Sequence, residues 1–552
     1  MSANNKKKIA PQKQATNHSA QKIDQPIKET PFADWHFAIL LTLLYLILAL
    51  WGSFHHEPWR DEFQALLIAQ NSHSLSELFF NIRQEGHPAM WHIMLYGISL
   101  FTKNIAGMKI LHVCMASMSV FLITAFSPFQ RPIKMLLSFG YFIFYEYMMI
   151  NRPYGAGMLF LFAFCVLYGM YVSKRNTYLL LCMGLDIFLL ANTSIFGVML
   201  SMALLFFLFV DARIGHLKNY LQKENKAAIF SSIILAITGL VIAILQIRPP
   251  ADNHFPIQYA TGYDLSRLKY ALTKIGITYL PIPKLGAVNC WNTSIFLKDQ
   301  KDYFVFISVI LITLFSFLFR KRTSIFLLYL AGTIGLLAFN YYTFQFGNRY
   351  SGHFFLLLMA CFWLFKTKGN PTEVNAQTKQ KAHLGKIGML TLYLLLVIQF
   401  FSGAYIYAMD IIYPFSNIDA LGKYIQENKL ENTKIVGTTD YLASPVSYFT
   451  RLPIYLPESK SMGTFITWDT KRLDGKLEIP EVFNQMKSMV EKQSAPALLI
   501  LSPELKVLKD GSPSPFEEGD IAEGIKMRNL AKIDKDCMEE TEKYYLYIVE
   551  KK

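Results

Sequence analysis

The sequence predicts a polytopic α-helical membrane protein with about eleven or more transmembrane helices, followed by a C-terminal soluble α/β domain. Hydrophobic residues make up 53% of the 552 residues and aromatic residues 15%, which is too apolar for a water-soluble protein of this length. Apolar stretches of about 20 residues, long enough to cross roughly 30 Å of hydrocarbon, recur from Trp35 to about Met409. The residues after Met409 are mixed and polar, so they predict a folded domain outside the lipid.

This pattern divides the chain into three parts. Residues 1–35 are polar and basic, and we expect them to form a disordered cytoplasmic tail followed by a permanent anchor rather than a cleaved signal peptide. Residues 36–409 are the predicted transmembrane domain, with long external loops at 55–104 and 248–302. Residues 410–552 are the predicted extracytoplasmic α/β domain.

Eleven segments have the length and apolar character of membrane spans. The predicted spans are 36–54, 105–126, 135–150, 155–173, 177–191, 195–211, 228–247, 303–319, 324–343, 351–366 and 387–409. With the N-terminus inside, this number places the basic clusters on the cytoplasmic side, as the positive-inside rule requires. These clusters begin at Arg131, Lys174, Arg213, Arg320 and Lys366. The apolar stretch 88–101 is only about 14 residues long, so we expect a re-entrant or interfacial helix there.

Alternating helix-like and strand-like patterns predict the α/β fold of the C-terminal domain. Ser416-Asn417 can cap an amphipathic helix that runs through Asn428. The predicted strands are Lys434–Gly437, Ala497–Ser502 and Tyr544–Val549. Asp440-Tyr441 follows the first strand, where α/β domains often place ligand-binding loops. We expect the domain to act as a lid or an acceptor-binding module over the external face.

Composition argues against several other classes of protein. The net charge of +14 comes from short basic clusters between apolar spans, which indicates membrane topology rather than nucleic-acid binding. The six cysteines have no repeated spacing, so no disulfide framework or zinc site is predicted. No cofactor is predicted to be required. A divalent metal is the alternative, because His55, His56, Glu57, His87 and His92 are ligand types, although they match no tight zinc spacing.

The first external loop carries an acidic pair, Asp61-Glu62, just outside the end of a predicted span. A carboxylate at the lipid–water boundary can reach both a soluble acceptor and the phosphate end of a lipid carrier. We expect partial desolvation there to raise the pKa of Asp61 and strengthen it as a base. The alternative is that both carboxylates are solvated charges that favour the N-terminal dipole of a juxtamembrane helix.

The arrangement of one span, an external Asp61-Glu62 pair and a later His87-Pro88 stretch resembles the polytopic glycosyltransferases of the GT-C fold. Protein O-mannosyltransferases and the bacterial aminoarabinose transferases of lipid A belong to that group. The resemblance implies that Asp61 is the catalytic residue. We expect Glu62 beside it to position the donor or the acceptor. It extends through short motifs to Asn151-Arg152-Pro153-Tyr154 and to Arg349-Tyr350. One departure is Ala89, where the mannosyltransferase pattern has a second proline, and it weakens the assignment of mannose as the sugar.

Several further residues are predicted to bind substrate. Arg152 and Arg349 lie on the predicted external face, where guanidinium groups can grip a polyprenyl phosphate; snorkelling at helix ends is the alternative. Glu146 is an ionisable group at predicted membrane depth, which demands a partner or a wet cavity. The complete set of predicted substrate ligands is Arg60, Arg83, His87, Glu146, Arg152, Tyr154, Arg349 and Tyr350.

These features together predict an inverting hexosyl- or pentosyltransferase that moves a sugar from a polyprenyl-phosphate donor to a protein, lipid or glycan acceptor. The expected location is the bacterial inner membrane, with the N-terminus cytoplasmic and the C-terminal domain external. The first alternative is a transporter or flippase of lipid-linked saccharides, although the sequence shows no repeated halves. The others are another lipid-dependent transferase and a non-catalytic scaffold.

Overall fold

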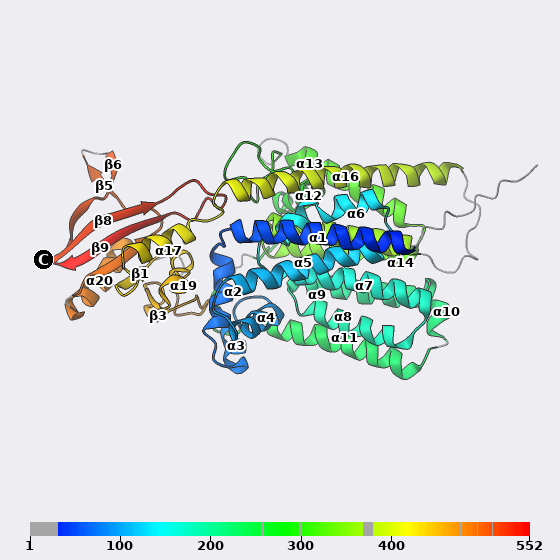
Figure 1. Ribbon diagram of the computed structural model, residues 1–552, viewed down its shortest axis with the longest axis horizontal. Helices are drawn as coiled ribbons and strands as arrows, with labels where there is room; N and C mark the ends of the chain where they lie inside the picture. The colour runs from blue at the N-terminus through cyan, green and yellow to red at the C-terminus, as the bar shows by residue number, and fades with distance from the viewer. Residues whose placement is uncertain are drawn as a thin grey trace, which may run out of the picture.

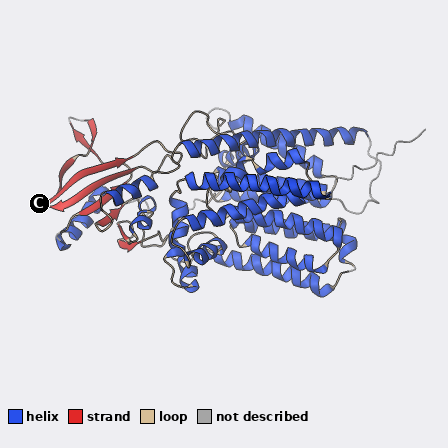
Figure 2. Cartoon of the chain, viewed as in Figure 1, coloured by secondary structure: helices blue, strands red, loops and turns tan. Residues whose placement is uncertain are grey.

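The computed structural model has a long helical bundle with a smaller α/β domain at one end (Figure 1). It describes residues 31–222, 224–255, 259–296, 301–367, 379–473, 477–493, 495–509 and 512–552. Most of the predicted N-terminal tail lies outside these residues, but the end of it is corrected, because the first helix already begins at Pro31. Strands are confined to the C-terminal domain among the described residues (Figure 2).

Eight helices of the described chain are long and apolar enough to cross a membrane, so the protein is a multi-pass membrane protein. Each spans at least 18 residues, or about 27 Å at 1.5 Å per residue. They are α1 (Pro31–His55), α5 (Ala106–Phe126), α7 (Tyr154–Lys174), α9 (Ile195–Ile214), α11 (Lys226–Ile247), α13 (Lys301–Phe319), α14 (Thr323–Tyr342) and α16 (Lys379–Ile412).

The predicted number of eleven spans is not confirmed. The segment 135–150 is not one helix: α6 (Arg131–Ser138) ends before Gly140, and a short π-helix, η1 (Tyr141–Glu146), follows. Helix α16 passes so close to this break that a Cβ on Gly403 would lie 2.9 Å from the backbone of Phe139. The predicted span 177–191 is helix α8 (Thr177–Ala191), whose 15 residues cover only about 22 Å.

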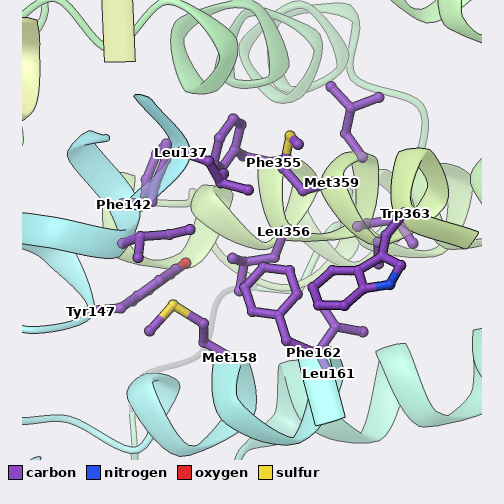
Figure 3. Packing of buried hydrophobic residues seen from close by; sticks show 14 of the residues in the cluster. Leu137, Phe142, Tyr147, Met158, Leu161, Phe162, Phe355, Leu356, Met359 and Trp363 are labelled. Carbon is purple, nitrogen blue, oxygen red and sulfur yellow. The ribbon is translucent and has the colours of Figure 1, made fainter. Parts of the chain in front are cut away.

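Helix α15 (Asn348–Lys366) lies in the centre of the bundle and is buried along almost its whole length. Phe355, Leu356, Met359 and Trp363 of α15 pack among side chains of α7 and of the α6–η1 segment (Figure 3). The rings of Phe162 and Trp363 stack with centroids 5.9 Å apart. Such dense packing holds α15 rigidly, so the residues at its N-terminus have a fixed position.

Short helices cover the end of the bundle that faces the C-terminal domain (Figure 1). These are α2 (Arg60–Gln70), α3 (Leu75–Asn81) and α4 (Met90–Ser99). Helix α4 has ten residues, about 15 Å, which is too short to cross the hydrocarbon, as predicted for 88–101. The loop 248–302 contains a helix that was not predicted, α12 (Leu265–Tyr279). Helix α10 (Lys218–Leu221) lies at the opposite end of the bundle.

The C-terminal domain is an α/β domain, as predicted. Its seven-stranded sheet has the order β3-β2-β1-β4-β9-β8-β7, with β1 parallel to β2 and β4 and the other pairs antiparallel. The strands are β1 (Lys434–Gly437), β2 (Ile454–Leu456), β3 (Ser461–Gly463), β4 (Ala497–Leu501), β7 (Glu518–Ala522), β8 (Ile525–Ile533) and β9 (Tyr544–Lys551), with a separate hairpin of β5 (Lys506–Lys509) and β6 (Ser512–Pro515). The helices are α17 (Ile418–Glu427), α18 (Asp440–Ala443), α19 (Val446–Thr450) and α20 (Ile479–Gln493).

Helix α2 packs into the hydrophobic core of the C-terminal domain. Phe63 and Leu67 of α2 are buried in the same cluster as residues of α17, β1 and β4. On the same helix, the side-chain amide of Gln64 donates to the backbone carbonyl of Ile466 at 2.9 Å and accepts from its N–H at 3.0 Å. The segment between α1 and α5, which carries α2, and the C-terminal domain therefore form one packed unit.

Candidate active site

The acidic pair lies in the first turn of α2, directly after the corner that follows α1. Trp59 is extended, and its backbone N–H donates to Oε2 of Glu62 at 3.1 Å, which satisfies a donor at the helix start. Carboxylates in a first turn also favour the helix dipole. The alternative interpretation, in which the carboxylates favour the N-terminal helix dipole, is therefore partly correct for Glu62. The side chain of Asp61 points instead toward guanidinium groups.

Glu62 is fully buried and saturated with hydrogen bonds. Its Oε1 accepts from the backbone N–H and the side-chain amide of Asn151 at 2.7 and 2.6 Å, and its Oε2 accepts from His56 and Trp59, both at 3.1 Å. Burial would raise the pKa of Glu62, but the charge of His56 and these hydrogen bonds hold it below its ordinary value. Four bonds use the lone pairs of a carboxylate. Direct contact of Glu62 with substrate does not fit this geometry. Glu62 instead positions Asn151, which precedes Arg152.

His56 lies between two buried carboxylates. Its Nε2 faces Glu62, and its Nδ1 lies 2.9 Å from Oδ2 of Asp410 in α16. Asp410 also accepts from the hydroxyl of Tyr145 at 2.9 Å, and Lys109 donates to the carbonyl of His56 at 2.8 Å. Burial would lower the pKa of His56, but Asp410 and Glu62 outweigh burial and raise it to about 10. A buried, charged histidine thus ties the α1–α2 corner to α5, η1 and α16.

Asp61 is the accessible carboxylate of the pair, with 28% of its side chain exposed. Its Oδ2 lies 3.0 Å from Arg349 and 3.9 Å from Arg152, and its Oδ1 lies 4.0 Å from Arg60. Burial would raise the pKa of Asp61, but these guanidinium groups outweigh burial and hold it below its ordinary value. The prediction of a raised pKa is therefore wrong, because it considered desolvation without the three cations that the fold brings to this side chain.

Arg152 and Arg349 converge on Asp61 from the starts of two helices. Arg152 lies two residues before α7 and donates to the backbone carbonyl of Asp61 at 2.7 Å. Arg349, in the first turn of α15, lies 4.8 Å from the ring centre of Trp59 and donates to the hydroxyl of Tyr350 at 2.8 Å. The aromatic face and the hydroxyl fix its orientation. The structure thus brings together the two arginines that were singled out as phosphate ligands.

Tyr154, Tyr350 and His87 form an aromatic wall beside these arginines. The ring of Tyr154 lies edge-on to Tyr350 at 5.9 Å and to His87 at 6.0 Å. Burial and the nearby Arg152 lower the pKa of His87 to about 3, so its ring is neutral. Within the described part of the chain, the Tyr154 hydroxyl and His87 Nδ1 are buried without a hydrogen-bond partner. Unpaired buried groups are rare, and these two are suited to meet a ligand or water.

Arg60 and Arg83, the other predicted cations, are engaged with the covering segments. Arg60 donates to the hydroxyl of Thr541 at 2.9 Å and lies 3.3 Å from Glu542. It therefore fastens the start of α2 to the loop before β9. Arg83 lies 3.4 Å from Asp252 in the loop after α11. Both arginines hold surrounding loops in place, and Arg60 contacts Asp61 only at the limit of an ion pair.

Glu146 lies one layer behind the site. Its Oε2 accepts from the hydroxyl of Tyr141 at 3.0 Å and from the indole of Trp291 at 3.3 Å. Trp291 in turn packs against Trp59, with ring centroids 5.0 Å apart. Oε2 of Glu146 therefore has two partners, whereas its Oε1 is buried without a hydrogen-bond partner among the described residues. Glu146 supports Trp291 behind Trp59 and does not contact Asp61.

Glu85 is a site residue that sequence reasoning missed. Burial raises its pKa to about 7, while a hydrogen bond from Gln64 and the charge of Arg152 oppose this shift; Asp61 adds to it. The amide of Gln64 lies 2.9 Å from Glu85. In the sequence, the signal for Glu85 was its position two residues before His87, since that loop was already assigned to the site. His56 and Asp410 were also missed as a pair, because 354 residues separate them.

A mainly apolar cavity of about 210 Å³ adjoins the aromatic wall. Its polar end includes Glu85, His87 and Tyr350, and the remainder is rich in aromatic side chains of α9, α14 and the loop 248–255, such as Phe196 and Phe339. Tyr350 belongs to both the cavity and the arginine pair. The apolar cavity therefore adjoins the positively charged region around Arg349.

No group of three or more potential metal ligands is clustered among the described residues. His55 is exposed and contacts the carbonyl of Trp51, whereas His56 is occupied by its two carboxylates. No family model matches the chain, and no curated protein is similar enough to indicate a relationship. The fold therefore defines the class on its own: a multi-pass helical membrane protein with an attached α/β domain and a charged site where the two meet.

Proposed function

We propose that this protein is a membrane glycosyltransferase that takes a sugar from a polyprenyl-phosphate donor and transfers it, with inversion, to an acceptor hydroxyl on the external face. One observation carries the proposal: a partly exposed carboxylate, Asp61, lies beside two arginines next to an apolar cavity. A base, a pair of cations for the phosphate and an adjoining apolar space are the parts that this reaction needs. A bacterial inner membrane with the C-terminal domain outside is part of the same proposal.

The donor would place its phosphate between Arg152 and Arg349 and the first units of its chain in the apolar cavity. Guanidinium groups bind phosphate oxygens bidentately, and the phosphate would compete with Asp61 for them. As the phosphate neutralises these cations, the pKa of Asp61 would rise toward the value that burial favours. Donor binding would thereby turn a weak base into a stronger one.

In the transfer step, Asp61 takes the proton of the acceptor hydroxyl as the acceptor oxygen attacks the anomeric carbon. The bond from that carbon to the phosphate oxygen breaks, and the electron pair leaves with the phosphate. Arg152 and Arg349 stabilise the charge that develops on the leaving phosphate. Glu62 acts as a positioning residue, because it holds the backbone of Asn151 immediately before Arg152.

The deciding experiment is Asp61→Asn in proteoliposomes with a lipid-linked sugar donor. Loss of a general base lowers a rate by roughly 10²–10⁴-fold, so we expect glycosidic bond formation to fall by that factor while the melting temperature stays near that of the wild type. Asp302→Asn is the matched control, since the Asp302 side chain is 77% exposed and pairs only with Lys269 among the described residues. A wild-type rate in Asp61→Asn refutes the assignment. Movement of the intact lipid-linked sugar without bond formation supports the transporter instead.

A further inference from the structure

A second cavity, of about 380 Å³, lies between the first external loop and the C-terminal domain. One wall comes from the end of α2 and from α3, with Asn71, Glu77 and Asn81. The opposite wall comes from the segment 459–467 and from Asp440. The space exists only because the domain is docked on α2, and it is separate from the residues around Asp61.

The chemistry of this lining favours an uncharged, hydroxyl-rich ligand. Hydroxyl and amide side chains face it from both walls, including Asn81, Ser461 and Thr464. No lysine or arginine lines the described walls, which disfavours an anionic ligand. The carboxylate of Asp440 is already neutralised, because Arg472 donates to it at 2.7 and 2.9 Å. The other carboxylate of the lining, Glu77, accepts from the backbone N–H of His73 at 2.7 Å. Phe465 adds an apolar surface of the kind on which the C–H face of a sugar ring packs.

The position of the cavity in the sheet agrees with a binding function. Asp440 follows β1, and Ser459 follows β2, the strand parallel to it. Ligands of open α/β sheets commonly bind outside the carboxyl ends of parallel strands. Glu458 lies at the same edge, where it accepts from the Thr438 hydroxyl at 2.6 Å and its other oxygen is buried without a partner among the described residues.

One short helix, α2, extends from Asp61 to the wall of the cavity. Asp61 lies in the first turn of α2 and Asn71 caps its end, so about 15 Å of helix separates them at 1.5 Å per residue. Ile466 lines the cavity and is clamped to Gln64 in the middle of α2. A chain-like ligand that starts in the cavity could therefore present its end at the active site.

We propose that this cavity binds an uncharged oligosaccharide segment of the acceptor, remote from the transfer site. That the bound oligosaccharide belongs to the acceptor rests on the proposed function, whereas the binding of a saccharide in this cavity does not. The two can fail separately, because binding is measured without donor and without turnover.

The experiment measures binding of a panel of uncharged tri- to hexasaccharides to the full-length protein in nanodiscs, by saturation-transfer NMR. Ser461→Trp fills the cavity, and we expect it to weaken binding at least tenfold. Ser512→Trp is the matched control, since Ser512 lies on the exposed β5–β6 hairpin away from the cavity. Asn81→Leu, which removes an amide from the opposite wall, provides a second variant with weakened binding in case Ser461→Trp does not fold.

Binding that is lost in a folded cavity variant and kept in Ser512→Trp supports the proposal. Binding that survives both cavity variants, or the absence of binding by every saccharide of the panel, overturns it. Binding of peptides in place of saccharides, blocked by the same substitutions, also overturns it and assigns the cavity to a polypeptide acceptor. If saccharides bind and the wild type nevertheless forms no glycosidic bond, the cavity assignment stands and the transferase proposal fails.

Discussion

Replacing His56 by glutamine tests the buried network that supports the site. In the wild type, His56 lies between Glu62 and Asp410 with its side chain fully buried. Glutamine retains a polar group but cannot carry a positive charge, so two buried carboxylates would face each other without compensation. Removing one partner of a buried ion pair costs about 3–5 kcal/mol. We expect the His56→Gln variant to be less stable by that amount at neutral pH.

The pH dependence of this loss can be worked out from the pKa of His56, which is raised from 6.5 to about 10. Each pKa unit is ~1.4 kcal/mol, so the full contribution to folding is about 5 kcal/mol. Because the folded pKa is above the unfolded one, the stabilisation is complete below pH ~6.5 and is lost as pH rises through ~10. Linkage gives about 4–5 kcal/mol at pH ~6 and about 1–2 kcal/mol at pH ~9.

The assay is thermal unfolding in detergent, followed by circular dichroism at these two pH values. With an unfolding entropy of ~2 cal/mol/K per residue, the difference of about 3 kcal/mol corresponds to about 3 °C in Tm for a chain of this size. The gap in Tm between wild type and His56→Gln should therefore narrow by about 3 °C from pH ~6 to ~9. His55→Gln is the matched control, because His55 is exposed and outside the network. An equal gap at both pH values refutes a charged His56.

Two further predictions concern the neighbours of Asp61. In Arg349→Ala, the nearest cation that lowers the pKa of Asp61 is lost, so burial dominates and that pKa rises. Since a base works above its pKa, the acid limb of the rate at limiting donor, which reports the donor-free protein, should move to higher pH, and an unmoved limb contradicts the role of Arg349. In Gln64→Leu, the clamp on Ile466 is lost and buried backbone groups stay unpaired, at a cost of about 1–3 kcal/mol. Faster amide exchange at 464–467 with α17 unchanged is expected, and unchanged exchange throughout contradicts the clamp.

Much of the organisation could be predicted from local patterns. Hydrophobic stretches located the long helices, and the strand at 434–437 was placed at its observed bounds, because both signals depend on residues near one another in the chain. The predicted span 135–150 is not one helix, because the chain breaks near Gly140 within a continuous apolar run. Apolar composition alone cannot distinguish one crossing helix from two short ones packed against α16.

The sequence by itself determined that the chain resides in a membrane and that Asp61, Arg152 and Arg349 are candidates for one site. Only the tertiary structure decided how they act on one another. It turned Glu62 into a buried support, and it surrounded Asp61 with guanidinium groups that lower its pKa instead of raising it. The physical reason is that a pKa depends on charges within a few ångströms. The two guanidinium groups with the largest effect on Asp61, those of Arg349 and Arg152, come from segments about 290 and 90 positions away along the chain, a separation that local pattern does not encode.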